Sequence, residues 1–214
     1  MMKKTTVIFD MDGVLFDSEK MYMKELLEFF NQNNICITKD MCKKVIGVDN
    51  TKFYQIVYQW WKYDTPFNEF VDILKSYYSH IYRDYKSILK PHVRELLIYL
   101  RNHGYKIALA SSSPKTLIMQ ALNSVDLEQY FDLITSGSQF KESKPDPEIY
   151  LYTMNQLNSL KDETLIVEDS YYGIQAAINA NVEVIALKDE ILNLDQSHAT
   201  HIINDLVEVI KYLK

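Results

Sequence analysis

The sequence predicts an α/β protein: a doubly wound parallel sheet of the Rossmann-like kind, with an α-helical domain inserted near its start. Two observations carry this prediction. Short apolar runs that suit buried strands alternate with helical patterns over most of the chain. Between about residues 18 and 85 this alternation stops, and only helical patterns occur.

Six short runs are predicted as strands, because they are rich in β-branched, aliphatic and aromatic residues and are bounded by turn residues. Apolar runs of this kind are typical of strands that are buried on both faces of a parallel sheet. The six runs are Thr5–Phe9, Tyr105–Ala110, Asp132–Thr135, Thr164–Val167, Val182–Leu187 and His201–Ile203.

Helices are predicted between these strands. Pro91–His103 has four aliphatic residues at helical spacing, and Gly104 follows where a C-terminal cap belongs. Asp146 and Pro147 supply an N-cap and a first-turn proline for a helix that runs to Leu157. The remaining helices predicted in this part of the chain are Gly173–Ala180 and Asp205–Leu213.

The region between the first two strands is predicted to form a domain of its own. Thr65 and Pro66 are expected to supply the cap and the first-turn proline of its last helix. About 70 residues are too many for one crossover connection, so we predict a helical cap domain over residues 17–86. Residues 1–16 and 87–214 would form the α/β core. The alternative is that these helices simply cover one face of the sheet. The four helical patterns are Glu19–Asn31, Lys39–Ile46, Thr51–Trp61 and Pro66–Tyr85.

The composition argues against several classes of protein. A net charge of -6 is unlike the basic face that nucleic-acid binding needs. Two cysteines in 214 residues do not make a disulfide framework, no secretory signal is visible, and no apolar stretch has the length of a membrane span. We therefore expect a cytoplasmic protein, a monomer or weak homodimer, with no nucleic-acid or membrane partner.

Two carboxylates directly follow the first predicted strand. Asp10 and Asp12 are two positions apart, and Gly13 permits a sharp turn after them. Ligands of open α/β sheets bind outside the carboxyl ends of the strands. Paired acids at such a place repel each other, and a divalent cation that prefers oxygen ligands removes the conflict. The pattern thus predicts a metal-assisted site, whereas the plainer interpretation is an ordinary Asp-x-Asp-Gly turn.

Two further segments suit phosphate binding. Ser111 follows the strand Tyr105–Ala110, so its hydroxyl can hold a phosphate oxygen at the same sheet edge, while Ser113 is expected to cap the next helix. Lys144 stands between a strand and a helix, where prolines on its C-terminal side restrict the backbone. An ammonium held in this way can neutralise a phosphoryl oxygen or the charge of the nucleophile, although most lysines are solvated surface residues.

An acidic pair follows the strand Thr164–Val167. Glu168 and Asp169 would complete a cation site with the first two acids at the carboxyl edge of the sheet. The alternative is that Asp169 or Ser170 serves only as the N-cap of the next helix. Gly173 is expected to let the start of that helix pack closely.

These pieces, in this order, resemble the four motifs of the haloacid dehalogenase superfamily of phosphohydrolases. The resemblance spans residues 7 to about 187. The segments 13–19 and 168–174 are similar to the branch that holds β-phosphoglucomutase and small sugar-phosphate phosphatases, in which a helical cap follows the first motif. His92 and Asn181 stand where the family usually has glycine. Asn suits a left-handed helix stop, and the sequence assigns no role to His92. The four motifs are Asp10-Met11-Asp12-Gly13, Ser111, Lys144-Pro145 and Glu168-Asp169.

The resemblance implies a reaction through a covalent intermediate. Asp10 would attack phosphorus and form an aspartyl-phosphate. Asp12 would protonate the leaving oxygen and then activate water for the second half of the reaction. Ser111 and Lys144 would hold the remaining phosphoryl oxygens, and the cap would close over the site and select the leaving group.

The same resemblance implies a magnesium cofactor. Its ligands would be Asp10, the backbone carbonyl of Asp12, and Asp169, with Glu168 bound directly or through water. The ion would offset the repulsion between the nucleophile and the phosphoryl group.

A phosphotransfer mutase would share every one of these core residues. In β-phosphoglucomutases, a cap His follows the first motif and an Arg follows a Gly-Val pair. This chain has Tyr22 and Asn50 at those places, and neither is a cation at neutral pH. Lys52 or Lys75 could substitute. We expect hydrolysis of a small phosphate monoester, a phosphorylated sugar or related metabolite, with the mutase as the alternative. A phospho-accepting receiver or binding module is more remote, because its acids form an adjacent pair after the first strand.

Overall fold

The computed structural model describes residues 3–46, 48, 50–188 and 194–214 of the chain. Contacts between residues divide the chain into two compact units. One unit, here called the α/β unit, comprises Met1–Asp17 and Tyr85–Lys214. The other, here called the helical unit, comprises Ser18–Asp84. That the helical unit acts as a cap stays a prediction.

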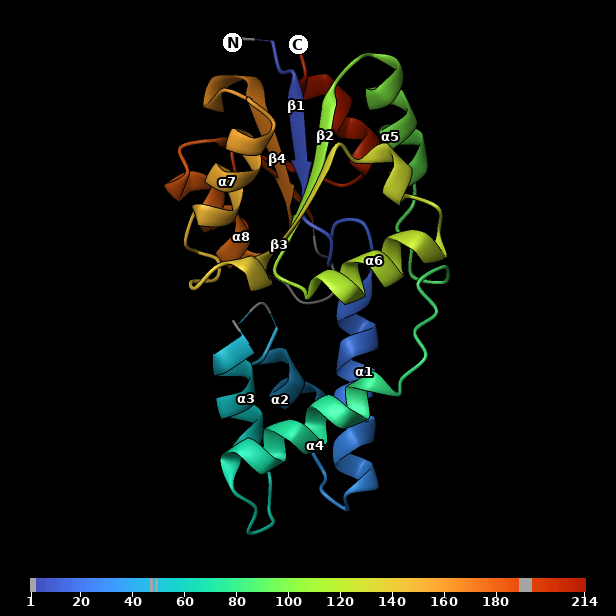
Figure 1. Ribbon diagram of the computed structural model, residues 1–214, viewed down its shortest axis with the longest axis vertical. Coiled ribbons are helices and arrows are strands. Elements are labelled where there is room, and N and C mark those ends of the chain that lie inside the picture. Colours follow the sequence, from blue (N-terminus) through green and yellow to red (C-terminus); the bar gives the residue numbers. More distant parts are fainter. Residues whose placement is uncertain (1–2, 47, 49, 189–193) are drawn as a thin grey trace. The chain divides into compact units, whose positions relative to one another are not determined.

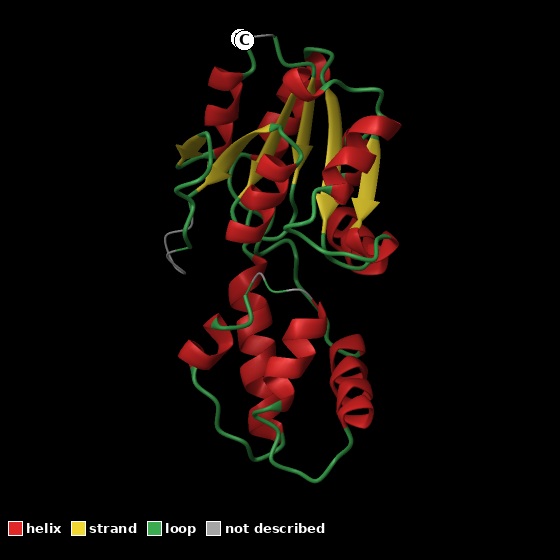
Figure 2. Ribbon diagram, turned by 90° about the vertical axis from the view of Figure 1, so that its left-hand side faces the viewer, coloured by secondary structure: helices red, strands yellow, loops and turns green. Residues whose placement is uncertain are grey.

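A six-stranded, wholly parallel sheet forms the centre of the α/β unit and confirms the predicted fold class (Figure 1, Figure 2). The strand order is β3-β2-β1-β4-β5-β6, so the first strand lies in the middle and the order reverses beside it. In doubly wound folds, ligands bind at such a reversal, outside the carboxyl ends of the strands. The strands are β1 (Thr6–Phe9), β2 (Lys106–Ser111), β3 (Leu133–Ser136), β4 (Thr164–Glu168), β5 (Glu183–Leu187) and β6 (His201–Ile203).

Helices lie on both faces of this sheet. Helices α7 (Glu148–Gln156) and α8 (Tyr171–Asn179) cover one face, while α5 (Val93–Asn102) and the C-terminal segment η4 (Leu206–Tyr212) lie on the other (Figure 1). The segment η4 is a 3-10 helix, closed by a capping box at its N-cap Asp205. The remaining elements of this unit are α6 (Lys115–Ser124), η1 (Glu128–Tyr130), η2 (Gly137–Gln139) and η3 (Lys161–Glu163).

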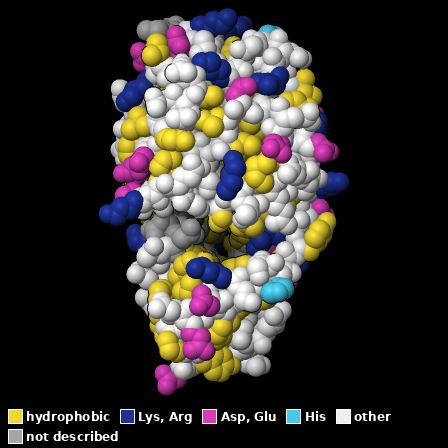
Figure 3. All heavy atoms as spheres, in the orientation of Figure 1, with side chains coloured by type: hydrophobic (Ala, Val, Ile, Leu, Met, Phe, Trp, Pro, Cys, Tyr) yellow, Lys and Arg dark blue, Asp and Glu magenta, His cyan; other side chains and the backbone are white. Residues whose placement is uncertain are grey.

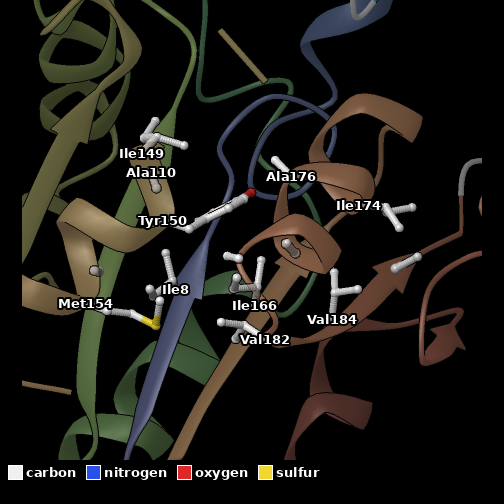
Figure 4. Close-up of a cluster of buried hydrophobic side chains, with 14 residues drawn as sticks. Ile8, Ala110, Ile149, Tyr150, Met154, Ile166, Ile174, Ala176, Val182 and Val184 are labelled. Carbon is white, nitrogen blue, oxygen red and sulfur yellow. The ribbon is translucent and has the colours of Figure 1, made fainter. Parts of the chain in front are cut away.

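One hydrophobic cluster joins the sheet to α7 and α8. Ile8 and Ile166, on the central strands, pack with Tyr150 and Met154 of α7 and with Ile174 of α8 (Figure 4). Tyr150 lies in the middle of this cluster, and its hydroxyl oxygen points away from Met154, toward the carboxyl side of the strands (Figure 4). The Tyr150 hydroxyl thus points from the hydrophobic core toward the edge of the sheet where the site is expected.

The helical unit has a separate aromatic core. Phe29, Phe30 and Phe70 are buried in it, and Phe29 stacks on Trp61 with ring centroids 5.7 Å apart. The helices are α1 (Ser18–Gln32), α2 (Lys39–Lys43), α3 (Asn50–Tyr58) and α4 (Phe67–Ser79).

Helix α4 differs from its prediction at both ends. Its N-cap is Pro66, without a side-chain cap, so the predicted cap role of Thr65 is wrong. The backbone carbonyl of Thr65 instead accepts a hydrogen bond from the hydroxyl of Tyr58, which links this residue to the end of α3. The helix stops at Ser79, and beyond it Arg83 forms a buried, bidentate ion pair with Glu25.

The surface is mixed in charge on the face shown in Figure 3. Lys and Arg side chains lie scattered there among acidic and apolar ones. This face thus has no continuous basic stripe among the described residues. None of the helices in the described part of the chain is both long and apolar enough to cross a membrane.

Candidate active site

The register of the sheet brings the predicted site residues to one edge. Phe9, the last residue of β1, pairs with Leu109 of β2 and with Val167 of β4. The residues that follow these positions are therefore neighbours at the carboxyl end of the sheet. Asp10 continues the pairing, because its N–H donates to the carbonyl of Val167 at 2.9 Å. Glu168 stands beside it, one position further along β4.

Lys144 joins these two carboxylates. Its Nζ lies 2.6 Å from Asp10 Oδ1 and 2.6 Å from Glu168 Oε1, and it also donates to the carbonyl of Ala110 at 3.1 Å. The Lys144 side chain is only 6% exposed. The sequence predicted a lysine near the nucleophile, and the structure brings Asp10, Lys144 and Glu168 together in one buried network.

Burial and charge act on the pKa values of this network in opposite directions. Burial, with added repulsion from Glu168 and Asp12, raises the pKa of Asp10 to about 7 even though Lys144 lowers it. Burial alone would also raise the pKa of Glu168, but Lys144 and the hydrogen bonds outweigh it and lower that pKa. Burial would lower the pKa of Lys144, but the two carboxylates hold that pKa well above its usual value. Lys144 and Glu168 are thus a charged pair, and Asp10 is the group most sensitive to a further cation.

Every oxygen of Glu168 is engaged by protein donors. Oε1 accepts from Lys144 and, at 2.7 Å, from the hydroxyl of Tyr150. Oε2 accepts from the backbone N–H groups of Asp169 and Ser170 and from the Ser170 hydroxyl, at 3.0 to 3.2 Å. A buried carboxylate with these five donors is held in a single orientation.

Two glycines leave space for the second acidic pair. A Cβ on Gly13, whose φ is +81°, would lie 1.9 Å from Asp169 Oδ2. A Cβ on Gly173 would lie 1.8 Å from Glu168 Oε1. Ser170 is the N-cap of α8, and its side chain accepts from the N–H of Gly173. The capping role left open for Ser170 is therefore real, and it exists alongside the acidic cluster.

Three buried carboxylates are close enough to share a cation. Asp10, Glu168 and Asp169 each offer an oxygen within 4.8 Å of the others. Such an all-oxygen set suits a hard divalent ion. Asp12 is oriented differently, because its carboxylate accepts a hydrogen bond from the Ser113 hydroxyl at 2.8 Å. A role for Asp12 in metal binding would therefore fall to its backbone carbonyl.

Two serines stand at the carboxyl end of β2: the predicted phosphate-binding role of Ser111 stays a prediction, and the predicted capping role of Ser113 is wrong. Ser111 is buried, and its Oγ accepts from the N–H of Ser113 at 3.0 Å. Helix α6 has Pro114 as its N-cap and no side-chain cap, so the prediction that Ser113 caps this helix is wrong. The physical reason is that α6 begins at Lys115 with Pro114 as its N-cap, so Ser113 lies one residue before the cap position, and its hydroxyl donates to the carboxylate of Asp12.

Two residues near the site were missed from the sequence. In the sequence, Tyr150 looks like one more apolar residue of α7, and Gln196 belongs to no recognisable sequence motif. Yet Gln196 is buried, and its amide donates to the carbonyl of Asp169 at 2.6 Å and to that of Leu187 at 2.8 Å. Both residues act through long-range contacts, so no local signal in the sequence could have revealed them.

The predicted specificity residues lie in the helical unit. Tyr22 is on α1, and the guanidinium of Arg83 lies 5.7 Å from the centre of its ring. Asn50 is the first residue of α3, and its side chain lies outside the described residues. Lys75, on α4, is exposed and lies 5.7 Å from the ring centroid of Tyr54. Lys52 is exposed on α3.

The two positions without the expected glycine have left-handed backbones. Asn181 has φ +58°, which is the helix stop that asparagine tolerates. His92 has φ +61° and is the N-cap of α5. Its Nδ1 lies 2.7 Å from Asp205 Oδ2, so the imidazole links the start of α5 to the start of η4.

Comparisons with known proteins show the family to which the chain belongs. A family model described as haloacid dehalogenase-like hydrolase matches residues 7–187. A protein named phosphorylated carbohydrates phosphatase, from Thermotoga maritima, is 33% identical over 185 residues, which cover 84% of this chain and 82% of that protein.

Solved structures share the fold. The crystal structure of a predicted phosphoglycolate phosphatase from Haemophilus somnus has a TM-score of 0.84 at 23% identity, over the whole of both chains. A β-phosphoglucomutase from Clostridium difficile has a TM-score of 0.79 at 21% identity, and the match covers 98% of this chain and 97% of that one. At these identities the structural likeness shows the fold, and the family match over most of the chain shows the lineage. The chain belongs to the haloacid dehalogenase-like hydrolases.

Proposed function

We propose that this protein hydrolyses the phosphate monoester of a small phosphorylated carbohydrate, through an aspartyl-phosphate formed on Asp10. One observation carries the proposal: Lys144 Nζ lies 2.6 Å from Asp10 and 2.6 Å from Glu168, at the carboxyl edge of the sheet. A carboxylate that accepts a hydrogen bond from a buried ammonium is oriented for attack on phosphorus, and a bound cation would favour its ionised form. The named activity of the Thermotoga maritima relative supports the choice of substrate class.

In the first half of the reaction, Asp10 is the nucleophile and Asp12 the acid. The attacking oxygen of Asp10 forms a bond to phosphorus, and the bond from phosphorus to the sugar oxygen breaks. Asp12 gives its proton to that leaving oxygen. Ser113, which donates to Asp12 Oδ2, fixes the orientation of this carboxyl group.

In the second half, water replaces the leaving group. Asp12, now ionised, accepts a proton from the water that attacks phosphorus, and the phosphorus–Asp10 bond breaks to release phosphate. Ser111 accepts from a backbone N–H and so keeps its own O–H to donate to a phosphoryl oxygen. Lys144 is close enough to Asp10 to neutralise the charge that develops on the phosphoryl group.

The acidic cluster is proposed to hold Mg²⁺. Asp10, Asp169 and the backbone carbonyl of Asp12 would be its protein ligands, and Glu168, which is engaged by five donors, would act mainly on Lys144. The ion would supply charge that offsets the repulsion between the nucleophile and the phosphoryl group. The raised pKa of Asp10 fits this role, because a bound cation favours the ionised form.

The central test is Asp10→Asn. This variant keeps the size of the side chain and removes the attacking charge, so kcat for a sugar phosphate should fall by several orders of magnitude while the fold survives. Asp162→Asn, an exposed residue of the same unit, is the matched control and should keep wild-type turnover. Substantial turnover by purified Asp10→Asn would remove Asp10 from the central role.

The metal is tested separately. Chelation should abolish turnover, and added Mg²⁺ should restore it, whereas Ca²⁺ should inhibit because it accepts looser coordination with more ligands. Binding of Mg²⁺ to the protein without substrate, measured by calorimetry, should be lost in Asp169→Asn. Full turnover in the presence of a chelator would show that the cation assignment is wrong.

A third experiment separates hydrolysis from phosphotransfer, because a β-phosphoglucomutase shares this fold. The protein is given β-glucose 1-phosphate, a bisphosphate primer and Mg²⁺, and both products are measured. We expect free phosphate to form faster, since Tyr22 has no charge with which to bind a second phosphate. Much faster formation of glucose 6-phosphate would make this chain a mutase.

A further inference from the structure

A buried tyrosine contacts the ion-pair network from inside the protein core. The Tyr150 hydroxyl donates to Glu168 Oε1 at 2.7 Å, and the residue is 0% exposed. The Nζ of Lys144 lies 4.9 Å from the centre of the same ring. One side chain therefore contacts both members of the pair that stands beside Asp10: the anion through a hydrogen bond and the cation through the face of its ring.

The contact has a direct consequence for the nucleophile. Lys144 is shared between two carboxylates at equal distances of 2.6 Å. The Tyr150 hydroxyl is a second donor to Glu168 Oε1, so this oxygen attracts the ammonium less strongly. Lys144 can therefore contact Asp10 as closely as it contacts Glu168. If the donor is removed, a buried oxygen of Glu168 loses a partner, and the ammonium is drawn toward it.

We propose that Tyr150 is a positioning residue for the reaction: its hydroxyl fixes Glu168 and thereby holds the ammonium of Lys144 on the nucleophile Asp10. The inference rests on the proposed function, in which Asp10 attacks phosphorus. Tyr150 does not bind substrate, because none of its surface is exposed. It does not act as an acid or base either, since burial and the neighbouring Glu168 raise the pKa of its phenol well above the usual value.

The conservative variant Tyr150→Phe tests this role. It keeps the ring under Lys144 and removes only the hydroxyl. At saturating Mg²⁺, kcat should fall about tenfold, the effect of about 1.4 kcal/mol or one hydrogen bond to a charged group, while KM changes by less than about twofold. Tyr152→Phe is the matched control, because Tyr152 undergoes the same chemical change on the same helix but is 37% exposed. Its kcat should equal that of the wild type.

A spectroscopic measurement follows Lys144 directly. In a ¹⁵N spectrum of the lysine ammonium groups, the Lys144 signal should shift in Tyr150→Phe. Lys4 provides an internal reference, because its side chain is also 6% exposed and is paired with Glu183 at 2.8 Å. Lys4 precedes β1 and so lies at the amino end of that strand, and its signal should stay in place.

A double-mutant cycle isolates the route through Glu168. Once Glu168→Gln has removed the carboxylate, Tyr150→Phe should reduce kcat by less than about twofold further. Additive losses would overturn the inference, because they would show that Tyr150 acts without Glu168.

The remaining outcomes also distinguish the two proposals. A Tyr150→Phe variant with wild-type kcat overturns the inference, provided that Asp10→Asn is inactive; an active Asp10→Asn contradicts the proposed function instead. An equal loss in Tyr152→Phe, or an unmoved Lys144 signal, counts against the inference. A Tyr150→Phe protein too unstable to assay at low temperature also overturns it, because the hydroxyl would then serve folding.

Discussion

The most informative perturbation is one that adds a single methyl group, Gly173→Ala. Gly173 lies in the first turn of α8, and a Cβ there would lie 1.8 Å from Oε1, 2.0 Å from Cδ and 2.3 Å from Oε2 of Glu168. These distances are far below van der Waals contact, so the carboxylate must move. Glu168 cannot move without losing donors, because five hydrogen bonds hold it.

The expected magnitude follows from two opposing effects. Replacing glycine by alanine in a helix interior gains about 1 kcal/mol of stability through helix propensity. A displaced Glu168 loses about two of its hydrogen bonds, at roughly 2 kcal/mol each for a charged acceptor. The free energy of unfolding should therefore fall by about 3 kcal/mol, which is also within the range of overpacked cores. Activity should fall by more than tenfold, since Lys144 moves with its partner.

Urea unfolding and turnover measure the two effects separately. Two alanine variants serve as controls: Gln175→Ala, in the same helix, should change stability by less than about 0.5 kcal/mol. Gly104→Ala has open space around the new Cβ but a φ of +75°, so it should cost about 1 kcal/mol from backbone conformation alone and leave kcat unchanged. A Gly173→Ala protein as stable and active as the wild type would refute the reasoning, because Glu168 would then have to be mobile.

Three other predictions concern single contacts. Ser113→Ala removes the donor to Asp12 and should lower kcat by about fivefold, on the order of one hydrogen bond, with little change in melting temperature. His92→Gly should change the free energy of unfolding by less than about 1 kcal/mol, because glycine adopts the left-handed backbone without strain, which offsets the loss of the exposed ion pair with Asp205. In His92→Val the free energy of unfolding should fall by about 2 kcal/mol, because valine gains no such relief. In the presence of a chelator, the free energy of unfolding should fall as pH rises from about 4 to 7. The reason is that the pKa of Asp10 is raised in the folded state, so the folded state binds this proton more tightly than the unfolded state does. Urea unfolding should show no such contribution in Asp10→Asn.

Each of these has an outcome that contradicts it. An unchanged kcat in Ser113→Ala would mean that Asp12 is oriented by other groups. Equal stabilities of His92→Gly and His92→Val would show that the left-handed backbone carries no cost at this position. If the stability difference between the wild type and Asp10→Asn is constant from pH 4 to 7, folding does not raise the pKa of Asp10.

The fold class could be predicted from the sequence because it depends on local patterns. Strand β1 follows from an apolar run, Thr6–Phe9, and its end follows from the acid that comes next. The predicted end of α4 was wrong: the helix ends at Ser79, and beyond it Arg83 pairs with Glu25, which is distant in the sequence. Local propensity cannot anticipate such a partner.

The sequence also predicted which charged residues lie together at one edge of the sheet. Asp10, Glu168 and Asp169 stand at strand ends, and parallel strands bring their carboxyl ends to one edge by geometry alone. Lys144 was predicted from the prolines that follow it, in the segment between β3 and α7. The pattern thus determined which residues meet. It did not determine which atoms bond: Ser113 was expected to cap a helix, but that helix begins after Pro114, and the Ser113 hydroxyl donates to Asp12.

What the sequence determined by itself is therefore the sheet, the inserted helices and the charged residues at one edge, since these follow from periodicity and from the ends of strands. Only the tertiary structure decided that Tyr150 and Gln196 support that edge from the protein interior and that Gly173 leaves the space for Glu168. The physical reason is that hydrogen bonds between distant segments depend on distances of a few tenths of an ångström, which packing sets and residue order does not.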